Sequence, residues 1–145
     1  MVKILIKKLN SKVKLPSYKT EGSSGMDIMA FIDKPISILP QKSELIPTGL
    51  SIAIPNNTEV QIRPRSGLAV KNNISVLNTP GTVDSDYRGE IKVILYNHGD
   101  KEFTVSNEDR IAQMILVPVI KANFEEVENL PETIRGDGGF GSTGK

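Results

Sequence analysis

The chain has 145 residues, which suits a single domain able to bury a sizeable core and gives no reason to expect a second one. Its 18 Lys and Arg residues balance 17 Asp and Glu residues, and the net charge of +1 argues against nucleic acid as a partner. Cysteine is absent and histidine occurs once, so disulfide frameworks, cysteine nucleophiles and zinc sites built from Cys and His are excluded or nearly so. Any metal would be a hard ion bound by oxygen atoms.

The first ten residues, MVKILIKKLN, place lysines among apolar residues and are too polar for a signal sequence. Their alternation over residues 2–9 predicts a strand, which could pair at the edge of a sheet. No run in the chain approaches the roughly 18 apolar residues of a membrane span. We therefore expect a cytoplasmic protein that does not contact a membrane.

The apolar run at residues 25–32, GMDIMAFI, contains a single acid, Asp27. A carboxylate in such a run is costly unless a partner compensates it. Two interpretations remain open. Asp27 either accepts hydrogen bonds from backbone amides at the start of a strand or is held there for a cation.

Short strand-like runs follow at residues 36–39, 43–46, 50–54 and 60–62, with prolines and a polar turn between them. The chain has no long stretch with the 3.6-residue period of a helix. Closely spaced short strands of this kind predict an all-β barrel or sandwich.

Residues 63–71, RPRSGLAVK, are the first cluster of polar groups that could bind a ligand. Ser66 is predicted to cap a single helical turn, so that backbone amides and the Arg65 guanidinium would point toward the same bound phosphate. The alternative is a short helix between strands with exposed arginines. Arg63 continues the strand alternation and is the weaker candidate.

The turn-rich segment at residues 81–89, GTVDSDYRG, lies between apolar runs at residues 74–77 and 91–96, which predicts a hairpin. Two carboxylates, a phenol and a guanidinium occur together in this bend. Such a group of side chains could be catalytic or simply solvated.

The run at residues 111–120 is apolar on both faces of a strand, apart from Gln113. The amide of Gln113 needs a partner, either backbone or ligand. Asp109 and Arg110, just before it, are interpreted as a structural ion pair. His98 lies in a polar turn and is expected to be solvated, without a role.

A last strand is predicted at residues 124–127, and the segment 135–144, RGDGGFGSTG, is half glycine. We therefore divide the chain into a core domain, residues 1–134, and a flexible tail, residues 135–145, which becomes ordered only when anchored. The tail amides and hydroxyls near Ser142 and Thr143 could bind phosphate with Arg135, and Phe140 could stack on a base. A disordered terminus is the alternative.

Five segments, GMDIMA, PRSGLAVK, NTPGTVDSDYRG, DRIAQMI and RGDGGFGSTG, together resemble the five motifs of the trimeric deoxyuridine triphosphatase (dUTPase) family in order and spacing. The resemblance extends from about residue 24 to residue 144. It implies a jelly-roll-like (β-clip) single domain with one short helix, in a homotrimer with shared active sites. The tail of one subunit would close over a site formed by the other two. Such enzymes use Mg²⁺ to hydrolyse dUTP to dUMP and pyrophosphate, which limits uracil in DNA and supplies dUMP for thymidylate synthesis.

The same resemblance implies a role for each matching position. Asp84 corresponds to the acid that deprotonates the water attacking the α-phosphorus, Tyr87 to the ring against the deoxyribose, and Asp27 to the acid that holds Mg²⁺ through a water. The remaining substrate-binding positions are Asn78 near the base, Thr82, Val83 and Lys92 around the uridine, Arg65, Ser66, Gly67 and Gln113 near the phosphates, and Arg135, Phe140, Gly141, Ser142 and Thr143 in the tail.

Two other functions remain as alternatives. A dCTP deaminase, or a bifunctional deaminase and dUTPase, shares this fold and triphosphate site but needs a catalytic glutamate, for which the sequence offers only Glu90 near the matching segments. A nucleotide-binding protein without turnover is the second alternative, which the intact candidate acids and tail argue against.

Overall fold

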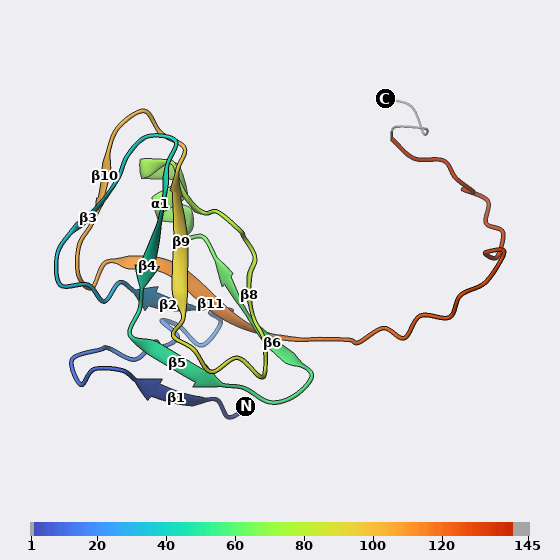
Figure 1. The fold of residues 1–145 in the computed structure, drawn as a ribbon, viewed down its shortest axis with the longest axis horizontal. Coiled ribbons are helices and arrows are strands. Elements are labelled where there is room, and N and C mark those ends of the chain that lie inside the picture. Colours follow the sequence, from blue (N-terminus) through green and yellow to red (C-terminus); the bar gives the residue numbers. More distant parts are fainter. Residues whose placement is uncertain (1, 141–145) are drawn as a thin grey trace.

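The computed structural model describes residues 2–140, which form an all-β domain with one short helix and an extended C-terminal segment (Figure 1). The predicted ligand-binding residues Gly141, Ser142 and Thr143 lie outside the described part. In chain order the elements are β1 (Leu5–Lys8), β2 (Met26–Met29), β3 (Ile36–Ile38), β4 (Ser43–Pro47), β5 (Leu50–Ala53), β6 (Thr58–Arg63), α1 (Ser66–Asn72), β7 (Ile74–Val76), β8 (Gly81–Val83), β9 (Lys92–Asn97), β10 (Phe103–Val105) and β11 (Arg110–Pro118).

The strands form two main sheets and two smaller pairs, all antiparallel. One sheet has the order β2-β11-β6-β8 and the other the order β4-β9-β7, while β1 pairs with β5 and β10 with β3. The prediction of an all-β, jelly-roll-like domain with one short helix is confirmed. Among residues 2–140, no helix combines the length and apolar composition needed to cross a membrane.

The core lies between the sheets because alternate side chains of their strands point inward. In β9, Val93 and Leu95 are buried, and β6 contributes Val60 and Ile62 to the same cluster. Burying one such side chain stabilises the fold by about 1.5 to 3 kcal/mol. The core also contains Asn97, which is fully buried and whose amide donates to two backbone carbonyls. Its polar atoms are therefore satisfied.

The predicted hairpin forms, but its connection contains an additional strand. β7 pairs with β9, with Ser75 opposite Tyr96, as the apolar runs indicated. Residues Gly81–Val83, predicted as part of the turn, instead form β8 and pair with β6. Gly81 and Val83 are buried on either side of the exposed Thr82, so this short segment has the alternation of a strand.

The helix is longer than predicted and begins differently. Seven residues are helical, and the N-cap is Arg65, which has an extended backbone (φ −95°, ψ 127°) and makes no side-chain capping bond. The prediction that Ser66 is the N-cap is therefore wrong, because the Arg65 carbonyl already accepts the amides of Leu68 and Ala69. Ser66 is instead the first helical residue and is exposed.

His98 also differs from its prediction. Its Nε2 atom lies 2.7 Å from the Ser75 hydroxyl, and its ring packs edge-on against Tyr96 at a centroid distance of 4.5 Å. The side chain therefore links the turn after β9 to β7 rather than being only solvated.

The C-terminal segment leaves the domain after β11 and, as far as residue 140, does not return to it (Figure 1). Among the residues up to 140, its last hydrogen bond to the body joins the Val119 amide to the Asn57 carbonyl at 2.8 Å. The strand predicted at residues 124–127 does not form, because a strand needs a neighbouring edge to satisfy its backbone groups. Large apolar side chains along this segment are almost fully exposed, namely Ile120, Phe124, Leu130, Ile134 and Phe140. They have no apolar surface of their own chain to cover them.

Candidate active site

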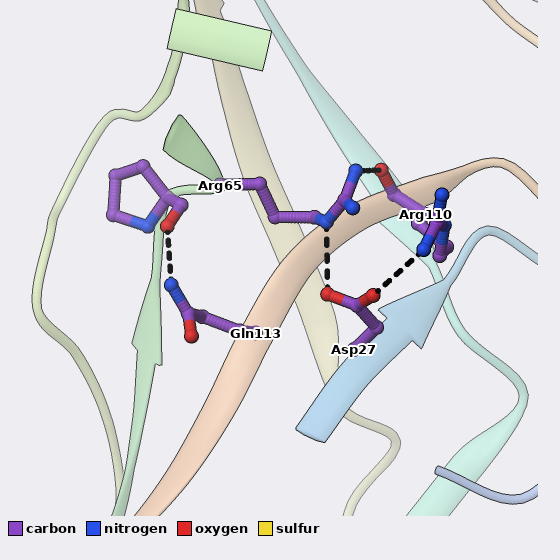
Figure 2. A network of polar contacts seen from close by, with 5 residues as sticks. Asp27, Arg65, Arg110 and Gln113 are labelled. Carbon is purple, nitrogen blue, oxygen red and sulfur yellow. Dashed lines mark hydrogen bonds and ion pairs between the residues drawn. The ribbon is translucent and has the colours of Figure 1, made fainter. Parts of the chain in front are cut away.

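Two arginine side chains flank the carboxylate of Asp27 on β2, which makes a cluster of three charged groups (Figure 2). Asp27 Oδ1 accepts a hydrogen bond from Arg65 Nε at 2.8 Å, and Oδ2 accepts one from Arg110 Nη1 at 3.2 Å. Its side chain is only 16% exposed, so these two cations compensate most of the cost of burying the charge. The partners of Asp27 in the structure are thus arginine side chains rather than backbone amides, and its role in holding a bound cation stays a prediction.

Arg110 is a member of this cluster that sequence reasoning missed. It was predicted to pair with Asp109, but Asp109 instead accepts a hydrogen bond from the Ser106 amide at 2.7 Å. Arg110 begins β11, whose pairing with β2 brings it near Asp27. Only the register between two strands far apart in the sequence creates this contact. A basic residue at the start of an apolar strand was the available signal.

Gln113 holds the segment that carries Arg65 against the sheet (Figure 2). Its Nε2 donates to the Pro64 carbonyl at 2.9 Å, so the backbone, rather than a ligand, is the partner seen for this amide. β11 places Gln113 between Asp27 on one side and Arg63 on the other. Its oxygen lies against Gly25, where an added Cβ would come within 2.7 Å. The side chain is therefore closely confined.

The Asp27 cluster carries a net charge of +1, because two guanidinium groups face one carboxylate. Ser66 and Gly67 follow directly and are exposed, with open space around the Gly67 Cα position. Arg63 is engaged in the strand, where its guanidinium donates to Gln61 Oε1 at 2.6 and 3.0 Å. The surface around Arg65 and Ser66 is thus suited to an anion.

A second group of predicted residues surrounds the bend after β8. A cavity of about 310 Å³ is lined by Leu45, Thr82, Val83, Asp84, Tyr87, Glu90, Ile91 and Lys92. A small adjoining cavity of about 60 Å³ is lined by Asn78, Thr82, Val83, Lys92 and residues of β6, β7 and β9. The structure therefore brings together Asn78, Thr82, Val83, Asp84, Tyr87 and Lys92.

Within this bend the carboxylate of Asp84 is exposed, and its carbonyl accepts the Tyr87 amide at 3.2 Å. The Tyr87 ring is 46% exposed, and its hydroxyl donates to the Glu90 carbonyl at 3.0 Å. An acid and an aromatic face thus border one cavity, an arrangement that can hold a water beside a flat apolar group.

The two groups lie on different parts of one chain. β2 and β8 are the outer strands of the four-stranded sheet, three strand spacings or roughly 14 Å apart. Along the sheet, Val83 pairs with Val60 near the start of β6, whereas Arg65 follows the end of β6. This adds on the order of 10 Å along the strands. One chain therefore does not assemble the Asp27 cluster and the Asp84 bend into a single site.

The predicted tail residues that the structure describes contact neither group. Arg135 Nε donates to the Gly138 carbonyl at 2.8 Å, and Phe140 is fully exposed.

Asp27 suits a metal ion whose direct ligands are mainly waters and phosphate oxygens rather than protein side chains. Among residues 2–140, no three His, Asp or Glu side chains form a cluster that could hold an ion. The two oxygens of Asp27 each accept one hydrogen bond and keep further lone pairs, so each can accept another hydrogen bond from a metal-bound water. Mg²⁺ usually keeps several waters and takes one or two carboxylates together with phosphate oxygens.

The chain is similar to known proteins over nearly its whole length. The sequence profile of the dUTPase family matches residues 11–144. Deoxyuridine 5'-triphosphate nucleotidohydrolases of Clostridium tetani and Gloeothece citriformis are 56% and 54% identical to the chain, covering 97% and 99% of it and 95% and 97% of their own lengths. The solved structure of the Staphylococcus bacteriophage 80alpha dUTPase with dUpNHpp superposes with a TM-score of 0.87, at 22% identity, covering 99% of each chain. A dUTPase mutant from phage phi11 of S. aureus, described with a structural Mg(II) ion, has a TM-score of 0.80 at 17% identity and covers 90% of this chain and 99% of its own. The chain belongs to the dUTPase family.

Proposed function

We propose that this chain hydrolyses dUTP to dUMP and pyrophosphate. The observation that carries the proposal is the bend after β8, where Asp84 and Tyr87 border one cavity in a chain more than half identical to dUTP nucleotidohydrolases. The reaction removes dUTP as a source of uracil in DNA and provides dUMP as a precursor of thymidylate.

Asp84 is proposed as the general base. An exposed carboxylate can hold a water by hydrogen bonding and accept its proton as the water attacks the α-phosphorus. Negative charge then develops on the phosphate oxygens, and guanidinium and hydroxyl groups stabilise it. We assign that role to Arg65 and Ser66, supported by the net positive charge of the Asp27 cluster.

Selection of the sugar and base is assigned to the bend and its strands. The exposed face of Tyr87 would lie on the C2′ edge of the deoxyribose, where a ribose hydroxyl would clash. Backbone groups of Thr82 and Val83, with Asn78 and Lys92 nearby, would pair with uracil. The exchanged donor and acceptor of cytosine would leave a buried polar group unpaired at a cost of about 1 to 3 kcal/mol. The methyl group of thymine would be excluded by crowding.

Mg²⁺ is the proposed cofactor, and Asp27 would hold it through a coordinated water. When bound, the ion would neutralise and orient the triphosphate. The lone pairs left on the Asp27 carboxylate support this role. Gln113 would act nearby by holding the Pro64–Arg65 segment in place.

A homotrimer with shared sites is the proposed assembly. Supporting it, the Asp27 cluster and the Asp84 bend lie far apart in one chain, so a substrate touching both would have to lie between chains. The exposed apolar side chains of the C-terminal segment also require a surface that its own chain does not provide. In this assembly Arg135, Phe140, Gly141, Ser142 and Thr143 would bind the terminal phosphate and cover uracil in a neighbouring site. The boundary between core and tail at residue 135 and the cytoplasmic location remain predictions.

The test is incubation of the purified protein with each dNTP and with UTP, with and without Mg²⁺, followed by separation of the products. We expect dUMP and pyrophosphate from dUTP alone. Ammonia released from dCTP would indicate a deaminase instead, and binding of dUTP without any product would indicate a protein that only binds nucleotides. Reaction in ¹⁸O-labelled water should place the label in dUMP, whereas label in pyrophosphate would contradict attack at the α-phosphorus.

A further inference from the structure

Two hydrogen bonds hold Tyr87 within its bend, one from its backbone amide and one from its ring hydroxyl. Its amide donates to the Asp84 carbonyl at 3.2 Å and its hydroxyl to the Glu90 carbonyl at 3.0 Å. These bonds fix the shape of the bend but not its position relative to the sheets. At the end of the bend, the Ile91 amide donates to the Leu50 carbonyl at 2.8 Å, and the side chain of the preceding residue, Glu90, adds a second contact to the body of the domain.

The side chain of Glu90 makes the contact that lies nearest to Tyr87 in the chain. Its Oε1 accepts the Gly49 amide at 2.9 Å, and its Oε2 lies 3.7 Å from Lys92 Nζ. Gly49 is itself confined, because its φ of +67° favours glycine and an added Cβ would come within 2.5 Å of Val13. The carboxylate therefore ties the bend to the fixed turn between β4 and β5.

The neighbouring glycine completes the arrangement. An added Cβ at Gly89 would lie 2.3 Å from the Tyr87 hydroxyl, so only glycine lets the tyrosine fold back over the chain and reach the Glu90 carbonyl. The φ of Gly89 is not among the positive values of this chain. An alanine there would be acceptable to the backbone and would displace only the ring.

We infer that Glu90 is a positioning residue that sets the place of the Tyr87 ring and thereby the preference for deoxyribose over ribose. The inference rests on the proposed function, in which that ring excludes the 2′-hydroxyl. Glu90 needs no contact with the substrate for this role. Glu90 acts by holding the bend in the position relative to the sheets that lets the Tyr87 ring cover C2′.

The test compares kcat/KM for dUTP and for UTP in the wild type, in Glu90→Ala and in Glu90→Gln. The ratio of the two values should fall roughly tenfold in Glu90→Ala, the scale of one lost charge-assisted hydrogen bond. Glu90→Gln keeps an oxygen acceptor for the Gly49 amide and should keep the wild-type ratio. A wild-type ratio in Glu90→Gln would show that the hydrogen bond to Gly49 positions the bend and that the negative charge near Lys92 is not required.

Thr48→Val is the matched control. It removes the 2.6 Å hydrogen bond from the Thr48 hydroxyl to the Ile91 carbonyl, which lies at the same junction but does not involve Glu90 or Tyr87. Its melting temperature should fall while the dUTP to UTP ratio stays as in the wild type. An equal loss of selectivity in Thr48→Val would overturn the inference in favour of general loosening, as would an unchanged ratio in Glu90→Ala.

Gly89→Ala provides a second measurement if Glu90→Ala does not fold. It should also lower the ratio, because the ring must move away from the added methyl group, and an unchanged ratio would overturn the inference. A wild type that hydrolyses neither nucleotide would refute the proposed function itself. If the wild type selects dUTP and the Glu90→Ala variant selects it equally well, only the role of Glu90 is refuted.

Discussion

The Arg110 guanidinium donates a hydrogen bond to the Asp27 carboxylate at 3.2 Å, although another acid, Asp109, directly precedes it in the chain. Together with Arg65 this leaves one excess positive charge beside Ser66, where the phosphates are proposed to bind.

Arg110→Gln should therefore weaken substrate binding more than stability. The change lowers the charge of the cluster from +1 to zero, so KM for dUTP should rise several-fold with little change in kcat. Because the Arg110 side chain is 49% exposed, its loss should cost less than about 1 kcal/mol of folding free energy. Lys14→Gln, which breaks the exposed ion pair with Glu108 elsewhere on the surface, is the control and should leave KM unchanged. An unaltered KM in Arg110→Gln would remove Arg110 from the binding site.

Asp84→Asn should retain binding of dUTP and lose turnover by roughly 10²- to 10⁴-fold, because an amide cannot accept the proton of the attacking water. Binding is measured by calorimetry and turnover by release of pyrophosphate. Asp86→Asn changes a neighbouring carboxylate of the same bend and should keep most of the activity. Full turnover in Asp84→Asn would show that another group is the base.

Removal of residues 135–145 should leave a folded protein with little turnover. Residues 135–140 make their hydrogen bonds within the tail, so cutting them away removes no hydrogen bond that they make to the domain. Circular dichroism and light scattering should match the full chain, while kcat/KM for dUTP should fall strongly. A truncated protein with the normal rate would show that the tail does not cover the site.

Mixing two inactive variants should restore activity if sites are shared between chains. Asp84→Asn and the chain lacking residues 135–145 are unfolded together and refolded, so that mixed trimers form. A site with Asp84 from the truncated chain and a tail from the other variant would then be complete. If each site were built from one chain, every site would lack either the acid or the tail. The mixture would then be as inactive as its components.

Gly25→Ala should destabilise the protein by about 1 to 3 kcal/mol, because the new methyl group would meet the Gln113 oxygen at 2.7 Å and Ile115 at 3.1 Å. Denaturant unfolding at equal protein concentration provides the measurement. Gly22→Ala, where an added Cβ meets nothing within 4 Å, is the control and should be close to neutral. Equal stability of the two variants would contradict the close confinement of Gln113.

The sequence alone predicted the class of fold and most of its strands. Alternation and proline breaks depend on neighbouring residues, and strands such as Lys92–Asn97 and Arg110–Pro118 appear where those patterns indicated. The resemblance of five short segments to one family also led to Asp27, Arg65, Asp84 and Tyr87 before any geometry was known. The helix cap at Ser66 was missed because a cap depends on backbone angles that composition does not determine.

Only the tertiary structure decided which of these residues meet. The pairing of Arg110 with Asp27, the strand at Gly81–Val83 and the contact of Glu90 with Gly49 all depend on register between segments distant in the sequence. The same register puts Arg65 and Asp84 at different ends of the sheet, and no local pattern in the sequence carries that information. Residue types and spacing thus determined which chemistry the chain can perform, whereas long-range strand pairing determined how its groups are distributed over the fold.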